Sequence, residues 1–354
     1  MAQVGWIMSS FGLGSFIGSW LGGKLTDKIG FYKVMVYSLF STGFLLIGLQ
    51  YITSFWGFVA GIFITMTIAD TFRPAMFVSL RVYSKPENQT RSITLIRLAI
   101  NLGFAFGPFI GGIIISSISY SGLFWIDGLT CISAILLFLF VLKEKKIKQQ
   151  NTEKSKIATL NSKSAYKDKA YLIFLGIVFI MAFVFFQLFS TIPLFYKEVH
   201  HLTEVYIGLI MALNGFLIFI LEMPLVQYLE KTVLNKIKII LWSMVLIALS
   251  YFVFNISDWY GVLIISMLII TLAEMLGFPF TNAFAMNRAT KGREGQYLSL
   301  YTMSFALALI FSSKVGMALV DSFGFAANWY IMGILSLIAA LLCIWLMRAT
   351  KTDL

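Results

Sequence analysis

Charged residues are scarce in this sequence of 354 residues, because Asp, Glu, Lys and Arg together make up 12% of it and hydrophobic residues make up 59%. That leaves too little polar surface to cover a water-soluble globule. The sequence also has only two cysteines and two histidines, and Cys131 and Cys343 lack the spacing of metal ligands. We therefore expect a membrane protein with no metal site and no cofactor. A phosphate-binding Gly-x-x-x-x-Gly-Lys-Ser/Thr run is absent as well, which disfavours an ATP-driven pump.

Eleven apolar stretches each have about the length, roughly 20 residues, that crosses a bilayer as a helix. Hydrocarbon offers no hydrogen-bond partners to the backbone, and the alternating pattern of a membrane barrel is missing, so the sequence predicts an all-α, polytopic helical bundle. The predicted spans are residues 4–22, 34–53, 56–80, 93–117, 122–142, 170–195, 206–228, 237–254, 258–285, 297–319 and 326–347.

Lys and Arg gather in every second loop, which accounts for the net charge of +11. The positive-inside rule places these loops, the central linker and the C-terminus in the cytoplasm. The location that follows is the cell (inner) membrane. No basic patch outside the spans is interleaved with aromatics that stack on bases, so a nucleic-acid partner is not expected.

Residues 143–169 form the longest polar stretch, rich in Lys, Ser, Asn and Gln, and such a composition is typical of a flexible linker. This linker separates an N-terminal half of five spans, residues 1–142, from a C-terminal half of six, residues 170–354. Two comparable halves require an even number, so we expect twelve spans, of which the first is absent from this sequence. Met1 opens almost directly onto a span with no positive leader, so a signal peptide is not expected.

The loop after the first span, residues 22–33, combines glycines for a tight turn with Asp27, which is suited to accept hydrogen bonds from a helix N-terminus. Lys28 is suited to pair with a carboxylate or a lipid phosphate. The run resembles the cytoplasmic loop signature of the major facilitator superfamily, Gly-x-Leu-x-Asp-Arg/Lys-x-Gly-Arg-Arg/Lys. It departs from that signature at Phe31 and Tyr32, where the family carries cations. The matching residues are Gly23, Leu25, Asp27, Lys28 and Gly30.

A second motif lies in the predicted span 93–117, where small residues favour close helix packing and a proline removes a backbone donor. The run resembles the Gly-Pro-x-x-Gly-Gly motif of the drug:proton antiporter branch, which belongs to the fifth of twelve helices. The alternative is a helix-packing motif that says nothing of transport direction, and Thr94 stands where the family has a further glycine. The residues concerned are Gly103, Gly107, Pro108, Gly111 and Gly112.

Charged side chains within spans are costly and therefore mark functional candidates. Asp70 and Arg73 share a helix face, where they are placed to pair or to bind substrate and proton in turn. Glu274 lies mid-span and is the stronger candidate for carrying a proton, because burial favours a neutral carboxyl. Glu222 lies nearer the cytoplasmic end, as a gate or structural residue.

Two cations complete this set. Lys314 is a candidate to neutralise Glu274, to bind an anionic group of the cargo, or to reach the outer surface. Arg97 lies near the cytoplasmic end of its span. We interpret it as a membrane anchor or as part of a contact made by the loop that contains Asp27.

The resemblance implies two pseudo-symmetric halves that alternate access to a central site. We expect a monomeric, proton-coupled transporter, surrounded by membrane lipid, that exports small amphipathic or drug-like organic compounds. One alternative is a proton symporter that takes up a small metabolite. Another is a membrane-embedded enzyme. For such an enzyme, the sequence offers one cluster of candidate metal ligands, which consists of His200 and His201 beside Glu198 and Glu204. We do not expect the protein to be an enzyme.

Overall fold

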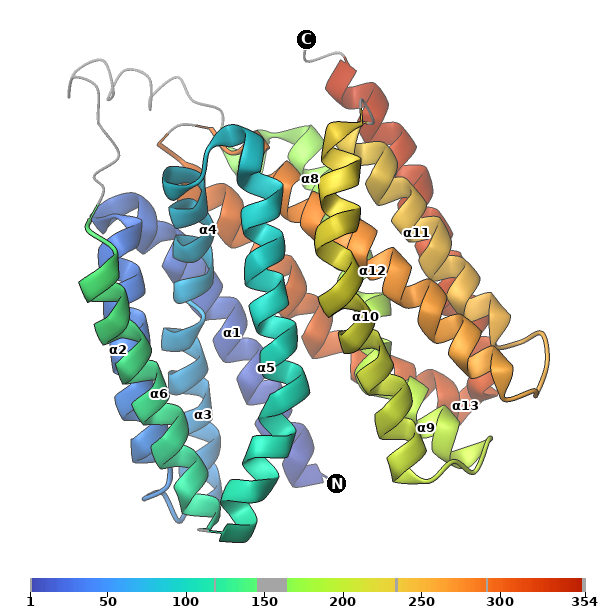
Figure 1. Ribbon diagram of the computed structural model, residues 1–354, viewed down its shortest axis with the longest axis horizontal. Coiled ribbons are helices and arrows are strands. Elements are labelled where there is room, and N and C mark those ends of the chain that lie inside the picture. Colours follow the sequence, from blue (N-terminus) through green and yellow to red (C-terminus); the bar gives the residue numbers. More distant parts are fainter. Residues whose placement is uncertain (1, 118, 145–163, 233–234, 291, 352–354) are drawn as a thin grey trace. The chain divides into compact units, whose positions relative to one another are not determined.

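The computed structural model describes residues 2–117, 119–144, 164–232, 235–290 and 292–351, and among these residues every regular element is a helix (Figure 1). The α-helices are α1 (Ala2–Ile29), α2 (Phe31–Leu49), α3 (Phe55–Ala69), α4 (Phe72–Tyr83), α5 (Gln89–Ser117), α6 (Tyr120–Val141), α8 (Lys169–Phe185), α9 (Thr191–Glu198), α10 (Glu204–Lys231), α11 (Lys236–Val253), α12 (Gly261–Arg288) and α13 (Glu294–Lys351). Short 3-10 turns are η1 (Pro86–Asn88), η2 (Ala165–Lys167) and η3 (Phe186–Phe189). The all-α membrane bundle is confirmed.

Eight helical segments among the described residues are long and apolar enough to cross a membrane. The last of them, Glu294–Thr350, contains two of the expected spans in one element. The break between those two spans is Gly324, whose φ of 80° lies in the left-handed region that glycine adopts readily. The loop expected between residues 319 and 326 is therefore a turn centred on one residue.

Two expected spans are interrupted instead of continuous. The span 56–80 divides into α3 and α4 at Asp70 and Thr71. Pro74 accounts for this break, because proline has no N–H to bond the carbonyl of Asp70 four residues earlier. The span 170–195 changes to the 3-10 turn η3 at Phe186 before α9 begins.

Contacts between residues define two compact units, each of which draws on both sides of the linker. One unit comprises Met1–Pro86, Gly107–Asp168 and Ala285–Ile310, and the other comprises Glu87–Phe106, Lys169–Phe284 and Phe311–Leu354. This grouping is not the predicted division into residues 1–142, 143–169 and 170–354, which stays a prediction. Residues 145–163 of the predicted linker lie outside the described residues.

In the first unit, α1 and α3 approach each other so closely that their backbones touch. A Cβ added at Gly14 would lie 2.6 Å from the carbonyl oxygen of Phe63, and one at Gly22 would lie 2.6 Å from Cα of Thr71. Gly18 faces the backbone of Thr67 between them. Glycines spaced by four residues thus form one face of α1 and permit the contact. In Figure 1, α2 and α6 lie side by side in the same unit.

Close packing was also expected around the second motif, and among the described residues no backbone approaches two of its glycines closely. A Cβ at Gly103 would meet nothing within 4 Å, and one at Gly111 would make an ordinary 3.6 Å contact with Leu123. A glycine permits a close approach only where another backbone faces it, which is the case on α1 and, within the described part of the chain, not at Gly103 or Gly111. Helix α5 runs through the whole motif, while the side-chain environments of Gly107, Pro108 and Gly112 lie outside the described residues.

Candidate functional site

Arg97 of α5 bridges two buried carboxylates within the second unit. Its Nε donates to Glu222 Oε1 of α10 at 2.8 Å, and its Nη2 donates to Glu274 Oε1 of α12 at 3.2 Å. The guanidinium carbon lies 4.7 Å from the ring centroid of Phe278, which adds a cation–π contact. The side-chain exposures of Arg97, Glu222 and Glu274 are 15%, 0% and 5%. We call Arg97, Glu222, Glu274 and Asn214 the arginine cluster.

The interpretation of Arg97 as a membrane anchor or a part of the loop contact is therefore wrong. Arg97 comes eight residues after the start of α5 at Gln89, and Glu222 comes nine residues before the end of α10 at Lys231. At about 1.5 Å per residue the two side chains lie at nearly equal depth, about 12–14 Å from those helix ends. A long guanidinium side chain at that depth meets a carboxylate more favourably than it reaches back to water.

The two glutamates differ in how fully their oxygens are bonded. Glu274 Oε2 accepts a hydrogen bond of 3.1 Å from Asn214 Nδ2, which also donates to Thr271 Oγ1 at 3.0 Å. Glu222 Oε2, in contrast, is buried and has no hydrogen-bond partner among the described residues. An unbonded carboxylate oxygen in a dry interior is costly, so Glu222 offers an open position for a proton or a hydrogen-bond donor.

The formal charge of the arginine cluster is −1 when both carboxyls are ionised, because one guanidinium faces two carboxylates. One added proton brings this charge to zero. Burying a net charge away from water is strongly unfavourable. The number of protons held by Glu222 and Glu274 therefore decides how readily the cluster can be closed off from water.

The remaining predicted in-span charges have other partners or none among the described residues. Arg73 Nε pairs with Asp70 Oδ1 at 2.8 Å, as the spacing predicted, and Ser15 of α1 donates to Asp70 Oδ2. Asp70 is thereby bonded at both oxygens. The ion pair of Glu274 is formed with Arg97, and none joins Glu274 to Lys314 among the described residues. Lys314 is exposed, and within the described part of the chain we find no ion pair for it.

Asp27 in the first unit contacts the beginning of α13. Its Oδ1 accepts a hydrogen bond from Gly295 N at 2.7 Å, and its Oδ2 accepts one from Gln296 N at 3.0 Å. These N–H groups belong to the first turn, which has no intrahelical acceptors, and the helix dipole favours a negative charge there. We refer to these two hydrogen bonds as the Asp27 contact.

The glycines of the first motif make this contact possible. A Cβ at Gly23 would lie 2.5 Å from Ser299 Oγ, and a Cβ at Gly295 would lie 2.6 Å from Asp27 Oδ1. Gly30 has a φ of 89° in the turn between α1 and α2, a conformation that favours glycine. Leu25 and Lys28 are exposed, and no ion pair of Lys28 occurs among the residues that the structure describes.

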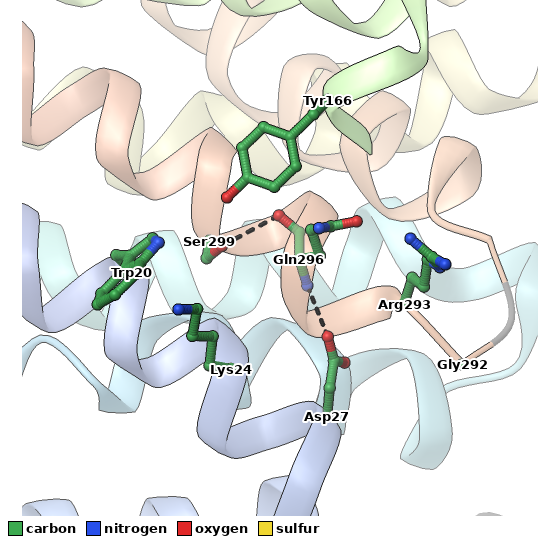
Figure 2. A pocket seen from close by; sticks show the side chains of 8 residues that line it. All are labelled: Trp20, Lys24, Asp27, Tyr166, Gly292, Arg293, Gln296 and Ser299. Carbon is green, nitrogen blue, oxygen red and sulfur yellow. Dashed lines mark hydrogen bonds between the residues drawn. The ribbon is translucent and has the colours of Figure 1, made fainter. Parts of the chain in front are cut away.

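Further residues hold the turn between α12 and α13 near Asp27. Arg81 of α4 donates from Nη1 to the carbonyl of Ala289 at 3.0 Å and lies 3.7 Å from Glu294 Oε1. Beside Asp27 is a cavity of about 290 Å³, shown in Figure 2. Its lining residues are Trp20, Lys24, Asp27, Tyr166, Gly292, Arg293, Gln296 and Ser299.

Asp27 also gives the site a predicted pH dependence. Although the side chain is exposed in part, desolvation of its carboxyl against the start of α13 raises the pKa to about 6, and Glu294 adds to this, while the backbone bonds and Arg293 oppose it. A pKa above that of a free aspartate, about 3.9, means that this conformation favours the protonated carboxyl. Its stability therefore falls as pH rises from about 4 through about 6.

We expect Asp27→Asn, which stays neutral, to gain stability relative to the wild type over the same pH range. Because the side chain is partly exposed and screened, the gain is at most about 1 kcal/mol. Thermal unfolding of both proteins in detergent between pH 4.5 and pH 7.5 measures it. A difference that is constant, or that shrinks as pH rises, contradicts this assignment of the charge.

Asp168 is a site residue that the sequence analysis missed. It directly follows η2 and is 2% exposed. Its Oδ2 and Oδ1 accept hydrogen bonds of 2.8 and 2.9 Å from Arg288 Nε and Nη2, and Tyr297 Oη donates to Oδ2 at 3.1 Å. The sequence hid this role because Asp168 stands at the end of a stretch rich in charged residues. The available signal was an acidic residue two residues before the apolar run that begins at Ala170, where a predicted span starts.

The two neighbouring histidines differ in their exposure to solvent. His200 is buried, with its ring 4.9 Å from that of Phe195 and 5.6 Å from that of Tyr260, whereas His201 is exposed. Burial lowers the pKa of His200. Within the described residues, no group of three or more potential metal ligands occurs.

Comparison with known proteins places this geometry in context. The sequence matches the family model "Major Facilitator Superfamily" in two overlapping ranges, residues 1–313 and 233–354. An uncharacterized MFS-type transporter of Bacillus subtilis (strain 168), YttB, is 23% identical over 314 residues, which cover 88% of this chain and 78% of that protein. A Na(+), Li(+), K(+)/H(+) antiporter of Planococcus maritimus is 20% identical over 354 residues, which cover 92% and 83%. The human organic anion transporter MFSD10 has a similar structure, with a TM-score of 0.78 at 17% identity over 96% of this chain and 83% of that one.

Proposed function

Since this chain belongs to the Major Facilitator Superfamily and is a secondary transporter, we propose that it couples the export of small amphipathic or drug-like organic compounds to proton entry. The observation that carries the coupling is Arg97 held between Glu222 and Glu274. The relatives named above are transporters, which favours transport over a membrane-embedded enzyme.

The coupling follows from the charge of the arginine cluster. With both carboxyls ionised the cluster has a net charge of −1, and it becomes neutral when it binds one proton or one monovalent cation. A proton and a cationic cargo molecule therefore compete to neutralise the same single negative charge, and such competition is the requirement for exchange. The open Oε2 of Glu222 is the position at which either one binds.

The cargo class follows from the surroundings of Arg97, the partner of both carboxylates. Phe278 lies against Arg97, and Phe185 lies 4.8 Å from Phe278, centroid to centroid. Aromatic rings next to a cluster that contains two carboxylates favour a cation with an apolar body. An organic cation fits this pairing of chemistries, and the resemblance at Gly107, Pro108, Gly111 and Gly112 supports export as the direction.

We assign the Asp27 contact to closing the cytoplasmic side between transport steps. Hydrogen bonds to two N–H groups at one helix end are individually modest and can form and break in each cycle. Arg81 acts on the same turn by holding Ala289 and Glu294. In this assignment the loops rich in Lys and Arg face the cytoplasm.

Exchange of an inorganic cation for a proton is the second candidate. It is favoured by the similarity to the Planococcus maritimus antiporter. An inorganic cation would neutralise the same net charge of −1 in the arginine cluster. The third candidate is proton symport of a small metabolite. In symport the cargo and the proton bind together and do not compete.

Proteoliposomes with an acidic interior and a pH-sensitive dye separate these readings. We expect addition of a lipophilic cation such as ethidium to release protons from the liposomes. Release by Na⁺, Li⁺ or K⁺ alone would favour the second candidate. Absence of release by any of these cations, from liposomes in which the protein is folded, would falsify cation/proton exchange.

A further inference from the structure

Residues Ser164–Asp168 lie directly against the start of α13. Asp168 forms the two-pronged ion pair with Arg288 at the end of α12 and accepts a hydrogen bond from Tyr297 in α13. The side-chain exposure of Asp168 in this pair is 3% and that of Arg288 is 23%. A bidentate pair that is largely removed from water fixes orientation as well as distance. The segment is thus anchored on both sides of the turn between α12 and α13.

A second set of contacts converges on Gln296. Its side-chain Oε1 accepts hydrogen bonds from Ala165 N at 3.1 Å and from Ser164 Oγ at 3.3 Å. Its backbone N–H is the group that donates to Asp27 Oδ2 at 3.0 Å. One residue is therefore held by α1 through its backbone and by residues 164–165 through its side chain. In Figure 2, Tyr166 and Asp27 line the same cavity on either side of Gln296.

The other restraint on this turn acts elsewhere. Arg81 bonds the carbonyl of Ala289 and approaches Glu294, so it restrains the residue that follows α12 and the first residue of α13. Gln296 and Tyr297 belong to the turn itself, and residues 164–168 bind both of them. A helix terminus without such restraints frays readily, which would remove the N–H groups from the reach of Asp27.

We propose that Ser164–Asp168 is a clamp that holds the first turn of α13 where Asp27 can bind it, and that Asp168 is the positioning residue of this clamp. The inference rests on the proposed closing role of the Asp27 contact, but the contact itself is measurable without transport. Asp168 itself binds neither the transported proton nor the cargo. It acts through Arg288 and Tyr297 on the geometry of Gly295 and Gln296.

Amide hydrogen exchange in the peptide that contains Gly295 and Gln296 tests the clamp in the full-length protein. We expect exchange there to be about tenfold faster in Asp168→Asn, which keeps the side-chain shape and removes the charge. Gln296→Ala leaves the buried ion pair intact and removes only the bonds to residues 164–165. It should accelerate the same amides, so the test does not depend on one variant folding. Asp258→Asn, in an exposed loop, is the matched control.

A double variant distinguishes positioning from general stabilisation. If Asp168 acts through the Asp27 contact, then Asp27→Ala with Asp168→Asn exchanges no faster at these amides than Asp27→Ala alone. Additive acceleration, or unchanged exchange in both single variants, overturns the clamp. Failure of the proposed transport function has a different signature, namely no cation-dependent proton release by wild-type protein whose exchange pattern is as expected.

Discussion

Replacement of Arg97 by Met is expected to abolish proton-coupled transport and to destabilise the protein by about 3–5 kcal/mol. The reason is that Glu222 and Glu274, exposed by 0% and 5%, would keep their burial and lose their shared cation. Removing one partner of a buried ion pair has a cost of this size, because a charge is left uncompensated. The unfolding midpoint in detergent and the proton release from proteoliposomes measure the two effects.

Arg91→Met is the matched control for this variant. Arg91 lies on the same helix and pairs with Glu230 at 3.4 Å, with side chains that are 36% and 15% exposed. A pair with a half-exposed partner is weaker than a buried one, and Arg91 is outside the arginine cluster, so this variant should transport normally. A triple variant, Arg97→Met with Glu222→Gln and Glu274→Gln, removes all three charges and should regain most of the stability without regaining transport. If Arg97→Met is as stable as Arg91→Met, the arginine cluster does not have the charges assigned to it.

Glu274→Gln is expected to lower proton-coupled transport at least about 100-fold while cargo still exchanges across the membrane. The amide keeps the shape of the side chain and a bond with Arg97, but the cluster is then neutral with Glu222 ionised. It no longer needs a proton to become neutral, so the single negative charge by which we propose that proton and cargo compete is removed. Proton release on addition of cargo should disappear, whereas exchange of labelled for unlabelled cargo, which moves no net proton, should persist.

Glu222→Gln tests whether the two carboxyls act as one unit. It gives the same formal charge, so we expect the same loss of coupling, together with weaker cargo binding because the open oxygen is replaced in part by a donor. Glu198→Gln, at an exposed position, controls for the substitution itself. Proton release by Glu274→Gln at the wild-type rate would remove Glu274 from the coupling mechanism.

The sequence predicted the helical bundle because hydrocarbon imposes one simple rule on composition and length. It also indicated that Asp27 suits the free N–H groups of a helix end, although residues 22–29 of the expected loop belong to helix α1. The three interruptions, at Asp70, Phe186 and Gly324, were not resolved. Hydropathy averages over whole turns and is insensitive to a single missing N–H or one left-handed residue.

The contacts that form the arginine cluster were not predicted from the sequence. The sequence indicated Glu222 and Glu274 separately but gave no reason to join them to Arg97, which is 125 and 177 residues away from them in the chain. Depth along the helices contained part of that information, because Arg97 and Glu222 lie almost equally far from the ends of α5 and α10 on the Lys- and Arg-rich side. What depth cannot supply is which helices are neighbours, and that depends on packing of the whole unit.

The contact between α1 and α3 has a mechanical consequence. Because the backbones meet at Gly14, Gly18 and Gly22 with no side chains between them, no compressible layer separates the two helices. We expect them to move as one rigid body, with Asp27 near the C-terminal end of α1 and Asp70, the partner of Arg73, directly after the end of α3. If the proposed opening separates Asp27 from α13, we expect Asp70 and its ion pair with Arg73 to move with α1, so that the motion involves two helices and not a single loop.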